Sequence, residues 1–112
     1  MRALVCKEYG PPSQLILDDL DDPKPSKGQI LIKVKAAGIN FPDVLSIEGK
    51  YQVKTEPPFI PGNEASGIIE AVGEGVERFK PGDQVITMSK GGAFAEKCVS
   101  DENTTIPLFP AL

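Results

Sequence analysis

The sequence predicts a mainly β domain, a barrel or sandwich of about six or seven short strands with one short helix. Eleven glycines and eleven prolines among 112 residues place many corners along the chain, which favours short strands over long helices. Strand-like runs also recur at the short spacing that is typical of all-β folds. A chain of this length forms one domain and buries roughly two-thirds of its unfolded surface, so it can support its own core.

The first predicted element is a hairpin. Residues 2–9 and 14–20 have strand-like composition, and the Gly- and Pro-rich connector 10–13 joins them. Four aspartates lie between residues 18 and 22. Because their spacing is not that of a calcium loop, we interpret them as a solvated strand end.

The next element is a strand that leads into the helix. Residues 30–36 alternate apolar side chains with lysines, which predicts a half-buried strand whose polar face meets water. Asn40 can cap the following helix, Asp43 stands where a capping box has its acid, and Gly49 provides the stop. We expect about two helical turns with one buried side. That side carries Phe41, Val44, Leu45 and Ile47.

The second half of the chain contains only strands and turns. Residues 67–72 form a predicted strand, and Gly73-Glu74-Gly75 turns the chain out of it. This turn lacks the third glycine of a dinucleotide fingerprint, and Pro81-Gly82, which fits a type II turn, lies too close for a helix to follow. Two more strands are predicted at 85–88 and 93–99. After Asp101 the periodicity is lost.

Composition argues against several kinds of partner. Twelve basic and sixteen acidic residues give a net charge of −4, which disfavours nucleic acid and anionic membranes. No window approaches the roughly 18 apolar residues of a membrane span, and no signal peptide is present, so we expect a cytoplasmic protein. Cys6 and Cys98 are interpreted as buried thiols in a reducing compartment. With no histidine and two isolated cysteines, the domain is expected to be metal-free.

Several motifs occur in an order that resembles one known family. They are Gly38-Ile39-Asn40-Phe41-Pro42-Asp43, Gly49-Lys50-Tyr51, Pro61-Gly62-Asn63-Glu64-Ala65-Ser66-Gly67, Val72-Gly73-Glu74-Gly75-Val76 and Lys80-Pro81-Gly82-Asp83-Gln84-Val85. Together they resemble the N-terminal catalytic domain of the medium-chain dehydrogenase/reductase superfamily, and its zinc-free quinone oxidoreductases in particular. The resemblance covers essentially all of residues 1–112. It implies a distorted, partly open β-barrel of the GroES-like type, with a Rossmann domain expected after Leu112 and absent from this chain.

The resemblance also implies a reaction and a set of site residues. The reaction is hydride transfer from NADPH to a quinone or a conjugated enone. Asn40 and Tyr51 would orient the acceptor, while Asn40, Phe41 and Asp43 would lie against the cofactor. Each has an alternative role, because Asn40 and Asp43 can serve only as helix caps and Tyr51 can pin its loop by packing. Glu64 is interpreted as a structurally paired carboxylate.

Two features of the resemblance concern metal and substrate. Zinc-dependent relatives hold their metal with a cysteine and a histidine at the positions of Asn40 and Asn63, so both ligands are missing here. An enoyl-thioester or enone reductase of the same superfamily remains an alternative to a quinone reductase. A non-enzymatic, ring-forming co-chaperonin-like module is the other alternative.

The isolated chain is expected to fold without being active. Most of the binding energy for NADPH would come from the Rossmann domain, so these residues alone should bind the cofactor weakly. The expected partner is a small-molecule quinone or enone. The full-length form is expected as a monomer or a homodimer, without contacts to nucleic acid or membrane.

Overall fold

The computed structural model describes residues 1–108, and within this range the chain is mainly β. The strands are β1 (Arg2–Val5), β2 (Ile16–Asp19), β3 (Gln29–Ala37), β4 (Glu64–Val72), β5 (Gln84–Met88), β6 (Lys97–Asp101) and β7 (Thr105–Pro107). The helices are α1 (Phe41–Glu48) and two 3-10 turns, η1 (Pro12–Gln14) and η2 (Glu102–Thr104). The predicted mainly β fold with one short α-helix is therefore confirmed.

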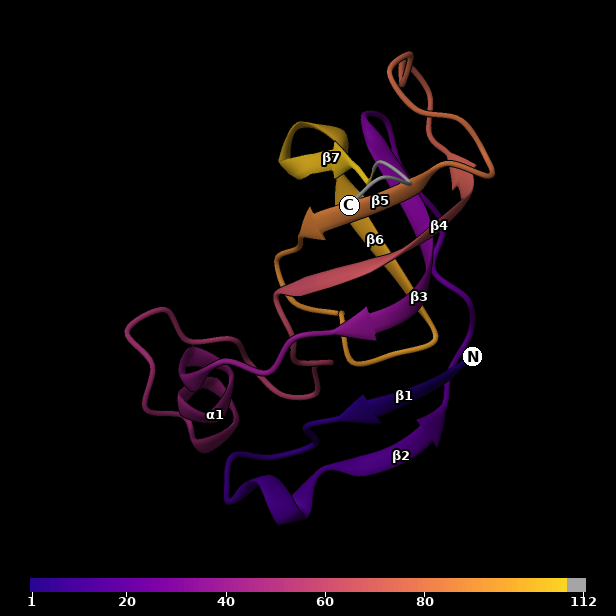
Figure 1. Ribbon diagram of the computed structural model, residues 1–112. Coiled ribbons are helices and arrows are strands. Elements are labelled where there is room, and N and C mark those ends of the chain that lie inside the picture. Colours follow the sequence, from indigo (N-terminus) through magenta and orange to yellow (C-terminus); the bar gives the residue numbers. More distant parts are fainter. Residues whose placement is uncertain (109–112) are drawn as a thin grey trace.

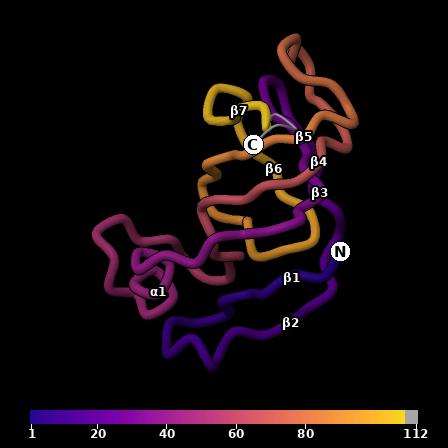
Figure 2. Tube along the Cα trace, viewed as in Figure 1, coloured from indigo at the N-terminus to yellow at the C-terminus, as the bar shows by residue number. Residues whose placement is uncertain are grey.

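The strands form two antiparallel sheets. The larger sheet has the order β6-β3-β4-β5-β7, and it curls into a half-barrel with α1 standing beside one end (Figure 1). The smaller sheet is the hairpin β1–β2, which lies below the larger sheet in the same view (Figure 2). The curled sheet confirms the expected partly open β-barrel.

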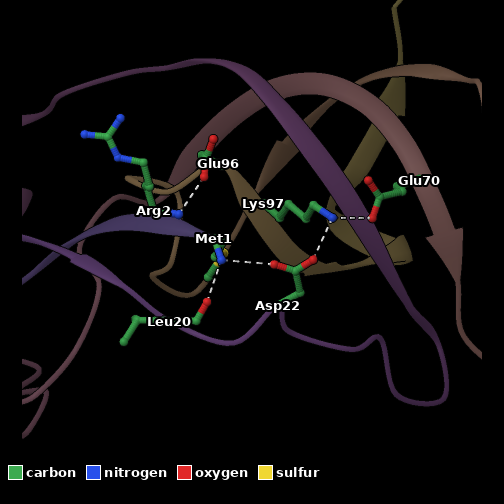
Figure 3. A network of polar contacts seen from close by, with 7 residues as sticks. All are labelled: Met1, Arg2, Leu20, Asp22, Glu70, Glu96 and Lys97. Atoms are coloured by element: carbon green, nitrogen blue, oxygen red, sulfur yellow. Dashed lines mark hydrogen bonds and ion pairs between the residues drawn. The ribbon is translucent and has the colours of Figure 1, made fainter.

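Backbone bridges and a polar network attach the hairpin to the larger sheet. Isolated bridges pair Ala3 with Ala95 and Cys6 with Phe59. In the network, the Met1 ammonium lies 3.2 Å from an oxygen of Asp22 (Figure 3). The second Asp22 oxygen accepts a hydrogen bond from Lys97 Nζ at 2.7 Å, and Lys97 also reaches Glu70 at 2.9 Å.

This network shifts the titration of its members. Asp22 and then Glu70 stabilise the charged ammonium and raise the pKa of Lys97. Lys97 and the Met1 ammonium lower the pKa of Asp22. Asp18 also forms an ion pair, with Lys7 at 2.9 Å. The aspartates that were predicted to form a solvated strand end are therefore partly engaged in ion pairs.

The core lies inside the curl of the larger sheet. Its central residues are Ile30, Ile32, Ile69, Phe79 and Val85, each at most 6% exposed. The alternation predicted for residues 30–36 holds only in part, because Leu31 is also buried and Ala36 is exposed. The register shifts between Leu31 and Ile32 and again after Val34, so the strand does not keep a strict two-residue period.

One close approach of two strands requires a glycine. A Cβ built on Gly67 in β4 would lie 2.1 Å from the carbonyl oxygen of Lys33 in β3. No side chain fits there, so this glycine lets β3 and β4 run together where the sheet bends.

The last part of the sheet differs from the sequence prediction. β6 begins at Lys97 and not at Ala93, and β7 forms after Asp101, where no strand was expected. A buried hydroxyl cluster joins these late strands. Thr87 Oγ1 lies 2.6 Å from Ser100 Oγ and 2.8 Å from Thr105 Oγ1, while Thr105 donates to the Asp101 carbonyl at 2.9 Å.

Candidate functional site

A pocket of about 550 Å³ lies beside α1. Its walls come from α1 (Asp43, Ser46), the loop after it (Tyr51, Val53, Thr55), the segment before β4 (Phe59 to Asn63), the loop between β5 and β6 (Lys90 to Gly92), β6 (Lys97 to Val99), Met1 and Pro23. These segments are far apart in the sequence. A concave site with an apolar lining and a few convergent polar groups is the usual form of a small-molecule site.

The start of α1 is built as the sequence predicted. Asn40 is the N-cap, with extended backbone angles, and its N–H donates to Asp43 Oδ2 at 2.8 Å. The Asn40 side chain faces the Asp43 N–H, although that N–H bonds the Asn40 carbonyl at 3.0 Å. At the other end Gly49 adopts φ 75° and ψ 21°, the left-handed stop that a glycine allows. The capping role of Asp43 is thus confirmed.

Asp43 has a second partner that the sequence did not indicate. Its Oδ1 accepts a hydrogen bond from Asn63 Nδ2 at 3.2 Å, across 20 residues of sequence. Asn63 Oδ1 in turn accepts from the Gly91 N–H at 3.0 Å, and the Asn63 carbonyl accepts from the Ser89 N–H at 2.8 Å. Asn63 therefore joins α1 to the loop between β5 and β6.

The four predicted site residues divide into two groups. Asp43, 1% exposed, and Tyr51, half-buried, both line the pocket. Asn40 and Phe41 are exposed and lie outside the lining, on the surface where α1 begins. The prediction that Phe41 belongs to the buried side of the helix is wrong, since its side chain is 73% exposed while Ile47 is 4% exposed. Within α1 only Asp43 and Ile47 are buried, so the buried side of this eight-residue helix does not include its first residue.

The loop that carries Tyr51 is held by a different tyrosine. Tyr9 Oη donates to the Thr55 carbonyl at 2.7 Å, and the Tyr9 ring packs against Gly49. Tyr51 lines the pocket, and within residues 1–108 its hydroxyl forms no hydrogen bond, so it can bind a ligand. No local pattern indicated the role of Tyr9, because it depends on a contact between the first hairpin and the loop.

Glu64 and the two cysteines complete the set of predicted roles. In the described part of the chain Glu64 makes no ion pair, so its predicted pairing is not found; the half-buried carboxylate lies against Gly38 instead. Cys6 and Cys98 are free, buried thiols, as expected. Burial raises the pKa of both, which keeps them protonated and unreactive.

Two features are absent from residues 1–108. No three His, Cys, Asp or Glu side chains are grouped so that they could hold a metal ion. The metal-free site remains a prediction. No helix in this range is long and apolar enough to cross a membrane.

Comparisons with known proteins identify the family. The model of the family described as "Alcohol dehydrogenase GroES-like domain" matches residues 26–110, and the chain belongs to this family. Quinone oxidoreductase from Rattus norvegicus is 44% identical over 110 residues, which are 96% of this chain and 33% of the relative. Among relatives of this kind the chain falls in the quinone oxidoreductase branch of the medium-chain dehydrogenase/reductases, as its motifs indicated.

Solved structures support the same assignment. The human synaptic vesicle membrane protein VAT-1 homolog-like protein has a TM-score of 0.95 at 32% identity, covering 100% of this chain and 36% of that chain. The quinone oxidoreductase of Thermus thermophilus, solved also with NADPH, has a TM-score of 0.82 at 33% identity, covering 100% and 34%. The chain thus spans about a third of the length of these relatives.

Proposed function

We propose that this chain is the substrate-side catalytic domain of a cytoplasmic, NADPH-dependent quinone oxidoreductase that transfers hydride to a quinone or a conjugated enone. The observation that carries the proposal is the quinone oxidoreductase likeness over 96% of the chain. A pocket of about 550 Å³ with Tyr51 among its lining residues is consistent with it. Two buried free thiols agree with a reducing compartment.

The residues of this chain fit only one side of a dinucleotide site. Pyrophosphate binding needs free N–H groups at a helix N-terminus, usually after a glycine-rich turn. At the N-terminus of α1 the Asp43 carboxylate already occupies the Asn40 N–H, and its negative charge would repel a phosphate. We therefore propose that a Rossmann domain outside these 112 residues holds most of the cofactor.

The chemistry that this chain contributes is orientation of the acceptor and exclusion of water. NADPH, when bound, supplies the hydride. The Tyr51 hydroxyl can donate a hydrogen bond to an acceptor oxygen, and the exposed Asn40 amide can do so without adding charge. Phe41 and Val53, both more than 70% exposed, provide apolar surface that a cofactor and its domain can cover. The hydrogen bond from the Asn40 N–H to the Asp43 carboxylate fixes the start of the helix.

Turnover by the full-length protein tests the proposal. We expect NADPH oxidation with substituted benzoquinones, and a Tyr51→Phe variant with kcat/KM lowered on the order of tenfold, because it loses one hydrogen bond to the acceptor. Turnover of enoyl thioesters in preference to quinones would replace the proposal with the enone reductase. No turnover of either class, together with a ring-sized mass in solution, would refute an enzymatic role.

The same preparation tests the prediction that no metal takes part. Elemental analysis should find less than stoichiometric zinc bound to this domain. Zinc that copurifies at one equivalent, and whose removal abolishes turnover, would contradict the assignment to the zinc-free branch.

A further inference from the structure

We propose that Asn63 is a positioning residue of the acceptor pocket, which holds the pocket-lining Asp43, and through it the N-cap Asn40, by linking α1 to the loop that carries Lys90. The link is a continuous series of hydrogen bonds. The Gly91 N–H donates to Asn63 Oδ1 at 3.0 Å, Asn63 Nδ2 donates to Asp43 Oδ1 at 3.2 Å, and the Asn40 N–H donates to Asp43 Oδ2 at 2.8 Å. What the pocket binds rests on the proposed function, whereas the link itself does not.

The chemistry of the partners fixes the orientation of the Asn63 amide. A backbone N–H can only donate, so the Asn63 oxygen must face Gly91. An ionised carboxylate can only accept, so the Asn63 nitrogen must face Asp43. Binding both Gly91 and Asp43 at these distances therefore requires a short side chain that carries a donor and an acceptor in one plane.

The environment makes this link sensitive to charge. Asp43 is 1% exposed, and it is the only carboxylate in the pocket lining among the described residues. Its hydrogen-bond partners, the Asn40 N–H and the Asn63 amide, are both neutral. A buried carboxylate depends strongly on such bonds, so a change at Asn63 acts directly on Asp43.

The position of Asn63 lets it transmit this effect to the site. The segment before β4 is already fastened to the loop between β5 and β6, because the Ser89 N–H donates to the Asn63 carbonyl and the Ala93 N–H to the Gly62 carbonyl, at 2.8 and 3.2 Å. The last turn of α1 is fastened elsewhere, by the Gly10 N–H on the Ile47 carbonyl at 3.1 Å. The Asn63 amide thus anchors the first turn of α1, where Asn40 lies.

Replacing Asn63 by aspartate keeps the hydrogen bond to the Gly91 N–H and removes the one to Asp43. The Asn63→Asp side chain can still accept from the Gly91 N–H, but it puts an oxygen opposite the Asp43 carboxylate. The two carboxylates repel each other when both are ionised, and a proton bound between them restores a donor, so the effect of Asn63→Asp should weaken as the pH is lowered. The other charged or titratable groups of the pocket lining are Lys90, Lys97, the Met1 ammonium, Tyr51 and Cys98. The matched control is Asn103→Asp, the same change at an exposed asparagine in η2.

Amide hydrogen exchange by NMR on this chain tests the link. At pH 8 we expect Asn63→Asp to accelerate exchange of the Asn40 N–H by about tenfold or more relative to the unsubstituted chain at the same pH, with a smaller effect at lower pH, while Asn103→Asp leaves it unchanged. The Ile69 N–H, bonded inside the core, should keep its protection, which separates a local release of α1 from a general loss of stability. Unchanged exchange at Asn40, or equal acceleration at Asn40 and Ile69, would overturn the proposal.

Two further measurements keep the test decisive. In the unsubstituted chain, the Asn63 side-chain amide protons should exchange about tenfold more slowly than those of Asn103. Equal rates would overturn the link. This comparison does not depend on whether Asn63→Asp folds. Duroquinone, whose fully substituted ring does not alkylate thiols, is the ligand probe. It should shift the Tyr51 and Gly91 amide signals, with a dissociation constant raised about tenfold by Asn63→Asp at pH 8 and not by Asn103→Asp. Absence of these shifts in the unsubstituted chain would refute quinone binding by the pocket while leaving the exchange result to decide the link.

Discussion

Thr87→Val should weaken the domain through the hydroxyl cluster that joins β5, β6 and β7. Thr87 Oγ1 forms hydrogen bonds with both Ser100 Oγ and Thr105 Oγ1. Either hydroxyl of each pair can be the donor, because Ser100 also reaches the Met88 carbonyl and Thr105 the Asp101 carbonyl. Valine has nearly the shape of threonine, and Thr87 is 1% exposed, so the substitution removes two buried hydrogen bonds without leaving a hole.

The expected loss is about 1–2 kcal/mol. Each hydrogen bond contributes about 1 kcal/mol, and the added methyl group recovers about 0.8 kcal/mol by burial. After the substitution Ser100 can donate to the Met88 carbonyl, 3.3 Å away, and Thr105 to the Asp101 carbonyl, 2.9 Å away, so neither hydroxyl proton is left unpaired. The triple variant Thr87→Val, Ser100→Ala, Thr105→Val should lose less stability than the sum of the three single losses, because the single variants share the hydrogen bonds between these hydroxyls.

Urea denaturation followed by far-UV circular dichroism measures these differences, since the chain has no tryptophan for fluorescence. Thr55→Val, at an exposed position, is the matched control and should change the free energy of unfolding by less than about 0.5 kcal/mol. A Thr87→Val variant as stable as the control would show that the hydroxyl cluster does not stabilise the domain. A triple variant whose loss equals the sum of the three single losses would show that these hydroxyls do not act together.

Four other outcomes follow from the structure. Asn40→Ala in the full-length enzyme should lower kcat/KM while costing no more than about 1 kcal/mol of stability, and unchanged kinetics would leave the residue only a cap. Calorimetric titration of NADPH into the isolated chain should detect no micromolar binding, and such binding would show that the cofactor site is misplaced. Gly67→Ala should cost about 3 kcal/mol or more, measured by denaturation, because its Cβ would lie 2.1 Å from the Lys33 carbonyl oxygen. Lys97 lowers the pKa of Asp22, so this ion pair stabilises the fold at pH values above the pKa of an unfolded aspartate. The contribution is lost as the pH falls through the lower pKa of the folded state. The free energy of unfolding of Asp22→Asn, measured over this acid range, should therefore depend less steeply on pH than that of the parent chain.

Local chemistry explains why much of the fold could be predicted. The hairpin, the cap at Asn40, the stop at Gly49 and the turn at Pro81-Gly82 each depend on a few neighbouring residues. β7 was missed because it has only three residues and is held by pairing with β5, which no local pattern reports. β6 begins late because the N–H groups of residues 92–94 bond the segment 60–62 instead of a strand.

The candidate site was less predictable for a related reason. Resemblance indicated Asn40, Tyr51, Phe41 and Asp43, and the structure brings only Tyr51 and Asp43 to the pocket lining. The resemblance indicated Asn63 only as a position that lacks a metal ligand. Its bond to Asp43 crosses 20 residues and depends on the bend of the chain before β4, so it becomes visible only when the segments are placed in space.

The strand order β6-β3-β4-β5-β7 has a consequence for synthesis on the ribosome. β3 pairs on one side with β6, so that Gln29 stands opposite Asp101, and the hairpin is bridged to Ala95. Neither contact can form until almost the whole domain has left the exit tunnel, which at roughly 5–20 residues per second leaves β3 unpaired on that side for several seconds. The buried run Ile30 to Ile32 is then exposed on the nascent chain, and we expect it to be a binding site for a ribosome-associated chaperone.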